Sequence, residues 1–148
     1  MIRLETVTPD NWRYDLSVAE DQKHFVASSA VILARAYAYR DHGGRAFVIY
    51  NDETPVGMAF YCDWFNEEGE GFYNFSQFFI DKKYQRRGFG LKAAELVLDM
   101  MREEGKFDKV VLCYVDGADA AREMYKKLGF YHTGDDYEDE IGMEMPLK

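Results

Sequence analysis

The stretch from Phe78 to Lys92 constrains the fold of this chain more than any other part of the sequence. It starts with an apolar run over residues 78–80 that is typical of a strand. It then passes through a basic turn and enters a helical pattern after Gly88 and Gly90. Because glycine has no Cβ, these two positions let the backbone approach a ligand closely and adopt conformations that other residues avoid. The first N–H groups of the following helix lack partners inside that helix, and they lie at the positive end of its dipole. The stretch therefore predicts a strand, a loop and a helix that together bind a phosphate or pyrophosphate group.

Two well-known phosphate-binding motifs do not fit this loop. A P-loop requires Gly-Lys followed by Ser or Thr, whereas Gly90 is followed by Leu91-Lys92. The dinucleotide-binding fingerprint requires a third glycine where Ala93 stands, and the acidic residue that should end a second strand is missing. An ordinary basic loop, with glycines that only serve the turn, is the alternative interpretation at this point.

Composition and charge limit the class of protein. The chain has 148 residues, and we predict a single domain over residues 1–148. Its 11 Tyr, 11 Phe and 2 Trp argue for a packed core and against disorder. The formal net charge of −9 argues against nucleic acid or an anionic membrane as a partner. A basic patch over residues 82–92 indicates an anionic cofactor there and a cationic substrate elsewhere, unless the acidity serves solubility alone.

Cysteine and histidine positions predict no metal site. Cys62 and Cys113 lie in separate apolar runs without metal-ligand spacing, and His24, His42 and His132 form no cluster. Two thiols in a chain of this size indicate a reducing compartment. The sequence has neither a signal-peptide pattern at its start nor an apolar run of membrane-spanning length. We therefore predict a cytoplasmic protein.

Hydrophobic periodicity predicts an α/β (α+β) fold with a mixed, mostly antiparallel central sheet flanked by helices. Strands are predicted over residues 2–7, 46–50, 56–65, 72–80, 109–115, 130–133 and 140–147. Helices are predicted over residues 11–19, 24–40, 88–104 and 120–128. Three antiparallel strands precede the first crossover, and a right-handed crossover after the fourth strand is the simplest way to close the sheet.

A second motif lies in the last predicted helix. Its pattern is Ala, three residues, Tyr, one residue, Lys, one residue and Gly-Phe, and the residues that carry it are Ala121, Tyr125, Lys127, Gly129 and Phe130. Together with the pattern Gln85-x-x-Gly88-x-Gly90 and the element order, this motif resembles the GNAT acetyltransferase superfamily over essentially the whole chain.

The resemblance implies a binding site for acetyl-CoA as co-substrate, where the strands around residues 78–80 and 113–115 splay apart. Main-chain groups of Phe78 and Ile80 would bond the pantetheine arm, and backbone N–H groups from Arg86 to Leu91 would hold the pyrophosphate. The full set of implied cofactor residues is Phe78, Phe79, Ile80, Gln85, Arg86, Arg87, Gly88, Phe89, Gly90, Leu91, Lys92 and Lys127.

The same resemblance makes Tyr125 the predicted catalytic residue. Direct acetyl transfer needs a neutral amine and a proton for the departing thiolate, and tyrosine is a suitable donor because its pKa of about 10 lies near that of a thiol. The alternative is a core tyrosine. The family usually has Asn where Ala118 stands, which puts that contact in doubt, although Asp119 is a candidate helix cap. The sequence does not identify the general base. The family often has a carboxylate on the fourth strand, but Asn74, Ser76 and Gln77 of that strand are not basic.

The acceptor is predicted from residues 16–27 and 33–37, which resemble bacterial spermine/spermidine N-acetyltransferases. A polyamine is a string of cations, which suits acidic and aromatic side chains. The candidate substrate residues are Glu20, Tyr37, Asp63, Trp64 and Glu67. The open alternatives are another small amine such as an aminoglycoside or amino acid, a peptide N-terminus, and a non-catalytic acyl-CoA sensor. A homodimer is a further expectation from the resemblance.

Overall fold

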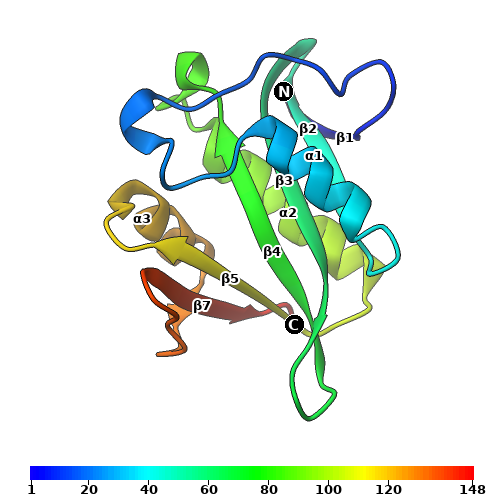
Figure 1. Ribbon diagram of the computed structural model, residues 1–148, viewed down its shortest axis with the longest axis vertical. Helices are drawn as coiled ribbons and strands as arrows, with labels where there is room; N and C mark the ends of the chain where they lie inside the picture. Colours follow the sequence, from blue (N-terminus) through cyan, green and yellow to red (C-terminus); the bar gives the residue numbers. More distant parts are fainter.

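The computed structural model describes residues 1–148, and all strands belong to one seven-stranded sheet (Figure 1). The strands are β1 (Ile2–Thr6), β2 (Arg45–Asn51), β3 (Thr54–Phe65), β4 (Gly71–Ile80), β5 (Lys109–Val115), β6 (Tyr131–His132) and β7 (Glu140–Pro146). Their order across the sheet is β1-β2-β3-β4-β5-β7-β6. Only β4 and β5 are parallel neighbours, whereas all other neighbours are antiparallel. The predicted mixed, mostly antiparallel sheet is confirmed.

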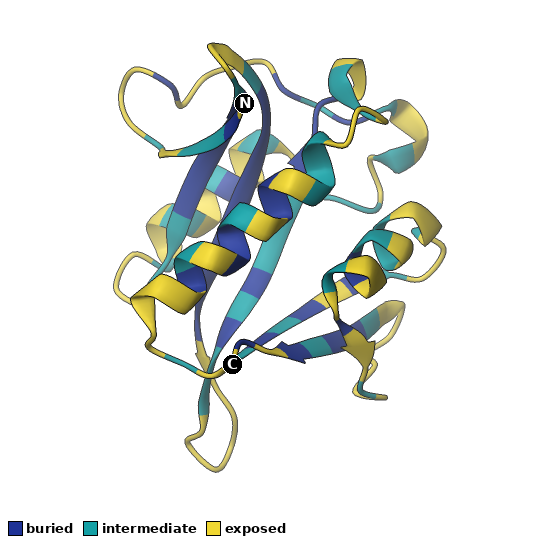
Figure 2. Ribbon diagram, turned by 180° about the vertical axis from the view of Figure 1, so that it is seen from behind, coloured by how far each residue is buried: buried dark blue, intermediate teal, exposed yellow.

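Helices cover both faces of the sheet. They are α1 (Ser29–Ala38), α2 (Phe89–Glu104) and α3 (Asp119–Leu128), with two short 3-10 turns, η1 (Glu20–Gln22) and η2 (Lys82–Tyr84). On one face, Ile32 of α1 packs with Phe60 and Phe79 of the sheet. On the other face, α2 and α3 contribute Val97 and Tyr125 to the main core, and both helices lie in the foreground of Figure 2. None of the helices is both long and apolar enough to cross a membrane.

Helix α2 follows its prediction closely because its sequence has one clear apolar stripe. Ala94, Val97, Leu98 and Met101 are buried at helical spacing against the sheet. The helix ends at Gly105, whose φ of 65° is the left-handed conformation that commonly closes helices. The predicted bounds, residues 88–104, differ from the observed ones only in that Gly88 is the N-cap.

The helix predicted over residues 11–19 is wrong, because side-chain hydrogen bonds fold this segment into turns. Asn11 accepts from the backbone N–H of Thr8 at 2.7 Å and donates to the carbonyl of Thr6 at 3.1 Å. Beyond these turns, Leu16 and Val18 are buried in the core beneath α1. An extended chain places both side chains on the same side, and a helix would not.

The second predicted helix, residues 24–40, starts later than expected. Helix α1 begins at Ser29, since Ser28 is its N-cap and accepts a hydrogen bond from the backbone N–H of Val31 at 3.2 Å. Residues 24–27 precede this cap and are not helical. They are therefore free to run along the edge of a cavity described below.

Candidate functional site

Strands β4 and β5 pair at one end and diverge at the other. Their parallel pairing includes only Tyr73 with Val110 and Asn74 with Val111, although β4 continues to Ile80 and β5 to Val115. This confirms the splayed strand pair that the family resemblance implies.

A β-bulge in β4 lies where the divergence starts. Phe60 pairs with Gln77, but the next residue of β3, Tyr61, pairs with Phe75, so that Ser76 is the extra residue on β4. An extra residue on one strand bends that strand and increases its local twist. The bulge therefore helps to turn β4 away from β5.

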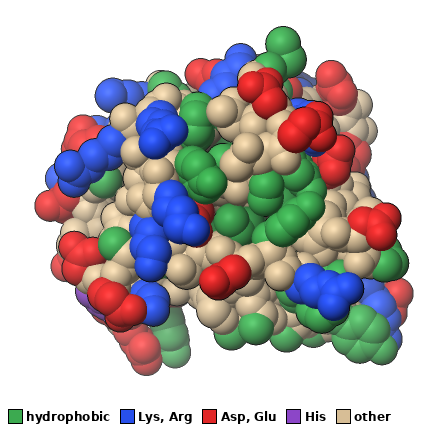
Figure 3. Space-filling view, turned by 90° about the horizontal axis from the view of Figure 1, so that it is seen from above, with side chains coloured by type: hydrophobic (Ala, Val, Ile, Leu, Met, Phe, Trp, Pro, Cys, Tyr) green, Lys and Arg blue, Asp and Glu red, His purple; other side chains and the backbone are tan.

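The divergence leaves a cavity of about 580 Å³. It is bounded by the end of β4, the loop before α2, the start of α3 and the N-terminal segment over residues 18–26. Tyr125, Met124 and Phe25 line it together with Phe78 and Phe79. Figure 3 shows the end of the molecule toward which β4 runs. Hydrophobic side chains gather there in a hollow, and Lys and Arg side chains form part of its border. The site thus combines an apolar interior with a charged rim.

The loop before α2 has the backbone geometry of an anion cradle. Arg86 and Gly88 both have positive φ, 63° and 81°, and α2 starts directly after Gly88. Successive N–H groups in such a turn, followed by a helix N-terminus, form a concave site for an anion. A Cβ at Gly88 would meet no atom within 4 Å, so that glycine is required here for its backbone conformation and not for space.

Basic side chains around this loop are exposed. Arg86 and Arg87 have no ion-pair partner in the chain, and the Arg87 guanidinium lies 5.8 Å from the ring centre of Tyr84. Lys92 lies 3.9 Å from Glu95 in the next turn of α2. The rim therefore retains positive charge for an anionic ligand.

The structure brings most of the predicted cofactor residues together. Phe78, Phe79, Ile80, Gln85, Arg86 and Gly90 line the cavity. Arg87, Gly88, Phe89, Leu91 and Lys92 continue the same loop and the first turn of α2 outside its lining. Lys127 lies exposed on α3 and does not line it.

Sequence reasoning missed two residues that brace the loop. Asp81 is 2% exposed, and its carboxylate accepts hydrogen bonds from the backbone N–H groups of Ser17 and Lys83, both at 2.9 Å. Gln22 accepts a hydrogen bond from the side-chain amide of Gln85 at 2.9 Å. That amide also donates to the carbonyl of Ile80 at 2.9 Å, so Gln85 faces protein partners. An acid directly after a buried strand was the available signal for Asp81, whereas nothing in the sequence marked Gln22.

Tyr125 is nearly buried and lines the cavity. It is 9% exposed, its ring centre lies 5.7 Å from that of Phe130 in an edge contact, and its hydroxyl has no hydrogen-bond partner in the chain. Burial raises the pKa of Tyr125 to about 12, so the hydroxyl is protonated at neutral pH. This group can donate a proton to a ligand in the cavity.

The start of α3 differs from the expectation for Asp119. Ala118 is the N-cap, and no side chain caps the helix. Asp119 is instead the first residue of α3, where its carboxylate lies 3.3 Å from Arg122. A carboxylate in the first turn still interacts favourably with the helix dipole. Both Ala118 and Asp119 line the cavity.

Two of the predicted acceptor residues are exposed and already have a cationic partner. Glu20 lies in η1 and forms an ion pair with Lys23 at 2.6 Å, which lowers the pKa of Glu20. Tyr37 is 69% exposed on α1, with the guanidinium of Arg40 4.1 Å from its ring centre. Neither residue lines the cavity, although Asp21 and Gln22 beside Glu20 do.

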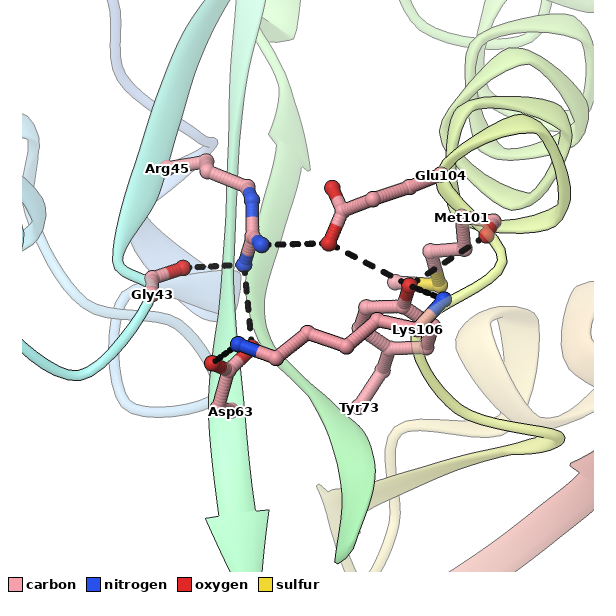
Figure 4. A network of polar contacts seen from close by, with 7 residues as sticks. All are labelled: Gly43, Arg45, Asp63, Tyr73, Met101, Glu104 and Lys106. Carbon is pink, nitrogen blue, oxygen red and sulfur yellow. Dashed lines mark hydrogen bonds and ion pairs between the residues drawn. The ribbon is translucent and has the colours of Figure 1, made fainter.

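The structure does not bring Asp63, Trp64 or Glu67 to the cavity. Asp63 is buried in a polar network, where its carboxylate pairs with Arg45 at 3.2 Å and with Lys106 (Figure 4). Gly57 of β3 pairs with Ile80, and the distance along β3 from Gly57 to Asp63 corresponds to roughly 20 Å.

The neighbours of Asp63 explain its place. Arg45 also pairs with Glu104, and the Tyr73 hydroxyl lies 3.2 Å from that carboxylate (Figure 4). Trp64 packs near Tyr39, with ring centres 6.2 Å apart, and Glu67 lies exposed in the turn between β3 and β4. The polar network around Asp63 joins β2, β3, β4 and the end of α2. Its role is therefore structural.

An acidic cluster that sequence reasoning missed lies beside the end of β5. Its members are Asp116, Asp119, Asp136 and Glu140, whose carboxylates lie near Cys113 or Tyr114 of β5, together with Asp139. The backbone N–H of Asp116 donates to the carbonyl of Asp139 at 2.8 Å, which joins the β5–α3 turn to the β6–β7 connection. Burial, followed by the charges of Glu140 and Asp136, raises the pKa of the Cys113 thiol. The run of acidic residues is visible in the sequence. The sequence does not reveal that the β6–β7 connection folds back beside β5.

No group of three or more His, Cys, Asp or Glu side chains is arranged to hold a metal ion.

Comparisons with known proteins agree with this geometry. A family model described as the acetyltransferase (GNAT) family matches residues 6–130. The chain is 28% identical over 142 residues to a probable spermine N(1)-acetyltransferase of Bacillus subtilis subsp. natto, and 27% identical over 142 residues to the spermine/spermidine N(1)-acetyltransferase of Bacillus subtilis strain 168. Each alignment covers 90% of both proteins.

Solved structures with the same fold are more distant in sequence. Spermidine N-acetyltransferase from Vibrio cholerae, in complex with CoA and spermine, has a TM-score of 0.75 at 16% identity, with 99% of this chain and 95% of that chain covered. An acetyltransferase from Thermus thermophilus has a TM-score of 0.77 at 16% identity, with 98% of this chain and 96% of that chain covered.

Proposed function

We propose that this chain, which belongs to the acetyltransferase (GNAT) family, transfers the acetyl group of acetyl-CoA directly to a primary amine of a polyamine such as spermine or spermidine. The observation that carries the proposal is the cavity at the end of β4, where β4 diverges from β5, with an anion cradle at its rim and the unpartnered hydroxyl of Tyr125 in its lining. An acyl-CoA has a long, flexible arm and an anionic end, which suit such a cavity.

The residues around the cavity suit acetyl-CoA as co-substrate. The N–H groups from Arg86 to Leu91 would hold its pyrophosphate at the N-terminus of α2. The edge of β4 beyond Asn74 has no strand partner on the β5 side, so main-chain groups near Phe78 are available to the pantetheine arm. The carbonyl of Ile80 already accepts a hydrogen bond from Gln85, which reduces its part in that contact.

Tyr125 would act as the general acid. Acetyl-CoA supplies an activated thioester. A neutral amine of the acceptor attacks the carbonyl carbon, a C–N bond forms and the C–S bond breaks. Tyr125 donates its proton to the departing thiolate and regains one from solvent, while the amine loses a proton to solvent or to a basic group. Because burial raises the pKa of Tyr125 to about 12, the required protonated form is present throughout the neutral pH range.

A cationic acceptor is favoured by the charge around the cavity. Asp21 of the N-terminal segment lines it without an ion-pair partner, and Asp119 of α3 lines it although it also pairs with Arg122. The acidic cluster at the end of β5 adds further carboxylates near Asp119. A chain of net charge −9 also attracts a polycation at long range. The two Bacillus subtilis relatives are named as acetyltransferases of spermine, or of spermine and spermidine, which agrees with this choice.

A second candidate acceptor is an amine that also carries a carboxylate, such as an amino acid or a peptide N-terminus. Arg35 of α1 donates a hydrogen bond to Ser76 at 3.3 Å, which places a guanidinium beside the β4 bulge. Neither Arg35 nor Ser76 lines the cavity, so this charge acts from beside it, where it favours a carboxylate over a polyamine. The acidic side chains thus favour a polyamine, whereas Arg35 favours an acceptor that carries a carboxylate. The experiment below distinguishes these two acceptors.

The test is the release of CoA thiol from acetyl-CoA with a panel of acceptors: spermine, spermidine, an aminoglycoside, free amino acids and a short peptide. We expect turnover to be greatest with the polyamines and to fall as salt rises, since screening weakens the attraction of a polycation. Activity with only amino acids or the peptide would show that the acceptor is not a polyamine, and it would leave the proposed cofactor site unchanged. Binding of acetyl-CoA without turnover on any amine would favour an acyl-CoA sensor.

A homodimer and a cytoplasmic location remain predictions. Light scattering of the purified protein would give the oligomeric state. The two cysteines form no disulfide with each other, which is compatible with a reducing compartment, and cell fractionation would test the location.

A further inference from the structure

One wall of the cavity is bonded to the loop that would hold the cofactor. We name residues 16–26 the wall segment and residues 81–90 the phosphate loop. Ser17 of the wall segment donates its backbone N–H to Asp81 at 2.9 Å and accepts from the N–H of Lys82 at 2.9 Å. Nearer the cavity, Gln22 accepts from the amide of Gln85 at 2.9 Å. Apart from the short η1 turn, the wall segment has no regular structure of its own, so these bonds help to fix its place.

We propose that Gln22 is a positioning residue that couples cofactor binding to the wall against which the acceptor packs. Its partner Gln85 lies in the phosphate loop and is held a second time by the carbonyl of Ile80. An anion bound to the N–H groups after Gln85 fixes the loop, and the Gln85 amide then fixes Gln22. Asp21, Phe25 and Val26 belong to the same wall segment and line the cavity. Their positions therefore depend on the phosphate loop.

This inference rests on the proposed function, because that function supplies the cofactor at the loop and the amine at the wall. Coupling between two ligands is reciprocal, so CoA raises the affinity for the amine by the same factor as the amine raises the affinity for CoA. The net effect of one hydrogen bond between neutral amides corresponds to roughly a 2- to 12-fold change in a binding constant. We expect coupling of this size and its loss when the bond is removed.

The experiment compares Gln22→Leu with Gln22→Glu in the full chain. Leucine keeps the approximate size but cannot accept a hydrogen bond, whereas glutamate keeps an accepting oxygen for Gln85. Hydrogen–deuterium exchange is measured with and without CoA. In the unmodified protein and in Gln22→Glu, CoA should slow exchange in the phosphate loop and in the wall segment. In Gln22→Leu, it should slow exchange in the phosphate loop but no longer at residues 20–26, because the bonds of Ser17 hold only the start of the wall segment.

A second measurement follows spermine affinity with and without CoA. We expect CoA to tighten spermine binding about 5-fold in the unmodified protein and in Gln22→Glu, and less than 2-fold in Gln22→Leu. A purely structural Gln22 would lower the unfolding temperature without changing this ratio.

The outcomes separate this inference from its premise. Protection of residues 20–26 that persists in Gln22→Leu would overturn the inference, because the Ser17 bonds or direct contact with CoA would then explain it. No protection of this segment in the unmodified protein would overturn it as well. If spermine does not bind the unmodified protein, the acceptor is wrong, and the exchange experiment still decides the role of Gln22 because it uses no amine. If CoA does not bind, the cofactor site and the coupling fail together.

Discussion

Tyr125 and Asp63 show how hydrogen-bond partners distinguish a side chain that is free to meet a ligand from one that is fixed within the protein. Both are buried and polar, and the sequence predicts both as site residues. The Tyr125 hydroxyl has no partner in the chain, whereas the Asp63 carboxylate is paired with Arg45 and Lys106. No side-chain polar atom of the chain is both fully buried and unpartnered, so the Tyr125 hydroxyl is accessible from the cavity that it lines and is free to bond a ligand there. Both oxygens of the buried Asp63 carboxylate are engaged, so it is not available to a substrate cation.

The first prediction concerns Tyr125→Phe. We expect turnover to fall about 100-fold, since this is the usual size of general-acid catalysis, while CoA affinity stays the same because the ring still packs on Phe130. The matched control is Tyr61→Phe, because Tyr61 is also buried with a pKa raised to about 12 but does not line the cavity. Steady-state kinetics and CoA titration provide the measurements. Equal turnover of both variants would exclude Tyr125 as the proton donor.

A second prediction concerns Asp63→Asn. We expect the free energy of unfolding to fall by about 2 kcal/mol, because Arg45 loses one of its two ionic partners and keeps only Glu104, while half-exposed Lys106 is largely rehydrated. The KM for the amine should not change, since Asp63 lies far from the cavity. Urea unfolding and amine kinetics test the two statements separately. A raised amine KM in a fully folded variant would return Asp63 to the acceptor site.

Secondary-structure elements with a clear periodic pattern were predictable, and those fixed by single side-chain bonds were not. Helix α2 and strand β5 follow their apolar patterns almost to the residue. The turns after β1 depend on Asn11, and the start of α1 depends on Ser28, so periodicity alone misplaced both. The loop glycines were recognisable because a positive φ limits the choice of residue.

The candidate site was predictable where a motif marks it and not where tertiary contacts create it. Gly88 and Tyr125 came from short patterns that the structure places at one cavity or on its rim. Gln22 belongs to the site because of its hydrogen bond to Gln85, which is distant in the sequence. Asp63 lies far from the cavity because the register of β3 on β4 pairs it with Tyr73. Contacts of this kind depend on the whole fold, so no local pattern reveals them.

A third prediction compares two glycines with the same backbone conformation. Gly88 has φ of 81° and Gly69 has φ of 82°, and a Cβ at either position would meet no atom within 4 Å. Alanine at either site should therefore cost about 1 kcal/mol of stability through backbone strain alone. Only Gly88→Ala should also weaken CoA binding, since it lies in the anion cradle, whereas Gly69 lies in the β3–β4 turn. Thermal unfolding and CoA titration of both variants test this, and equal CoA affinities would contradict the cradle.

In the whole molecule, buried tyrosines link stability to alkaline pH. Burial raises the pKa values of Tyr50, Tyr61 and Tyr125 to about 12, whereas an unfolded tyrosine has a pKa of about 10. Below about pH 10 both states hold these protons, so the three groups cause no pH dependence. Between about pH 10 and 12 the unfolded state releases them first, and the folded state loses stability as pH rises.

The fourth prediction follows from this sign. The free energy of unfolding in urea should fall between about pH 10 and 12, and tyrosinate absorbance of the native protein should rise in two stages. In urea, all 11 tyrosines should titrate together near pH 10. A single native step near pH 10 would show that these side chains are accessible to solvent.

The limited pairing between β4 and β5 also has a mechanical consequence. Hydrogen bonding joins the two parts of the sheet only near Tyr73 and Asn74, so the strand ladder is almost interrupted in the middle of the molecule. A ligand that bonds to both edges of this opening acts as a removable cross-link, and its binding energy adds to the energy needed to separate the two parts. We expect resistance to proteolysis, and with it the lifetime of the protein, to follow the supply of that ligand.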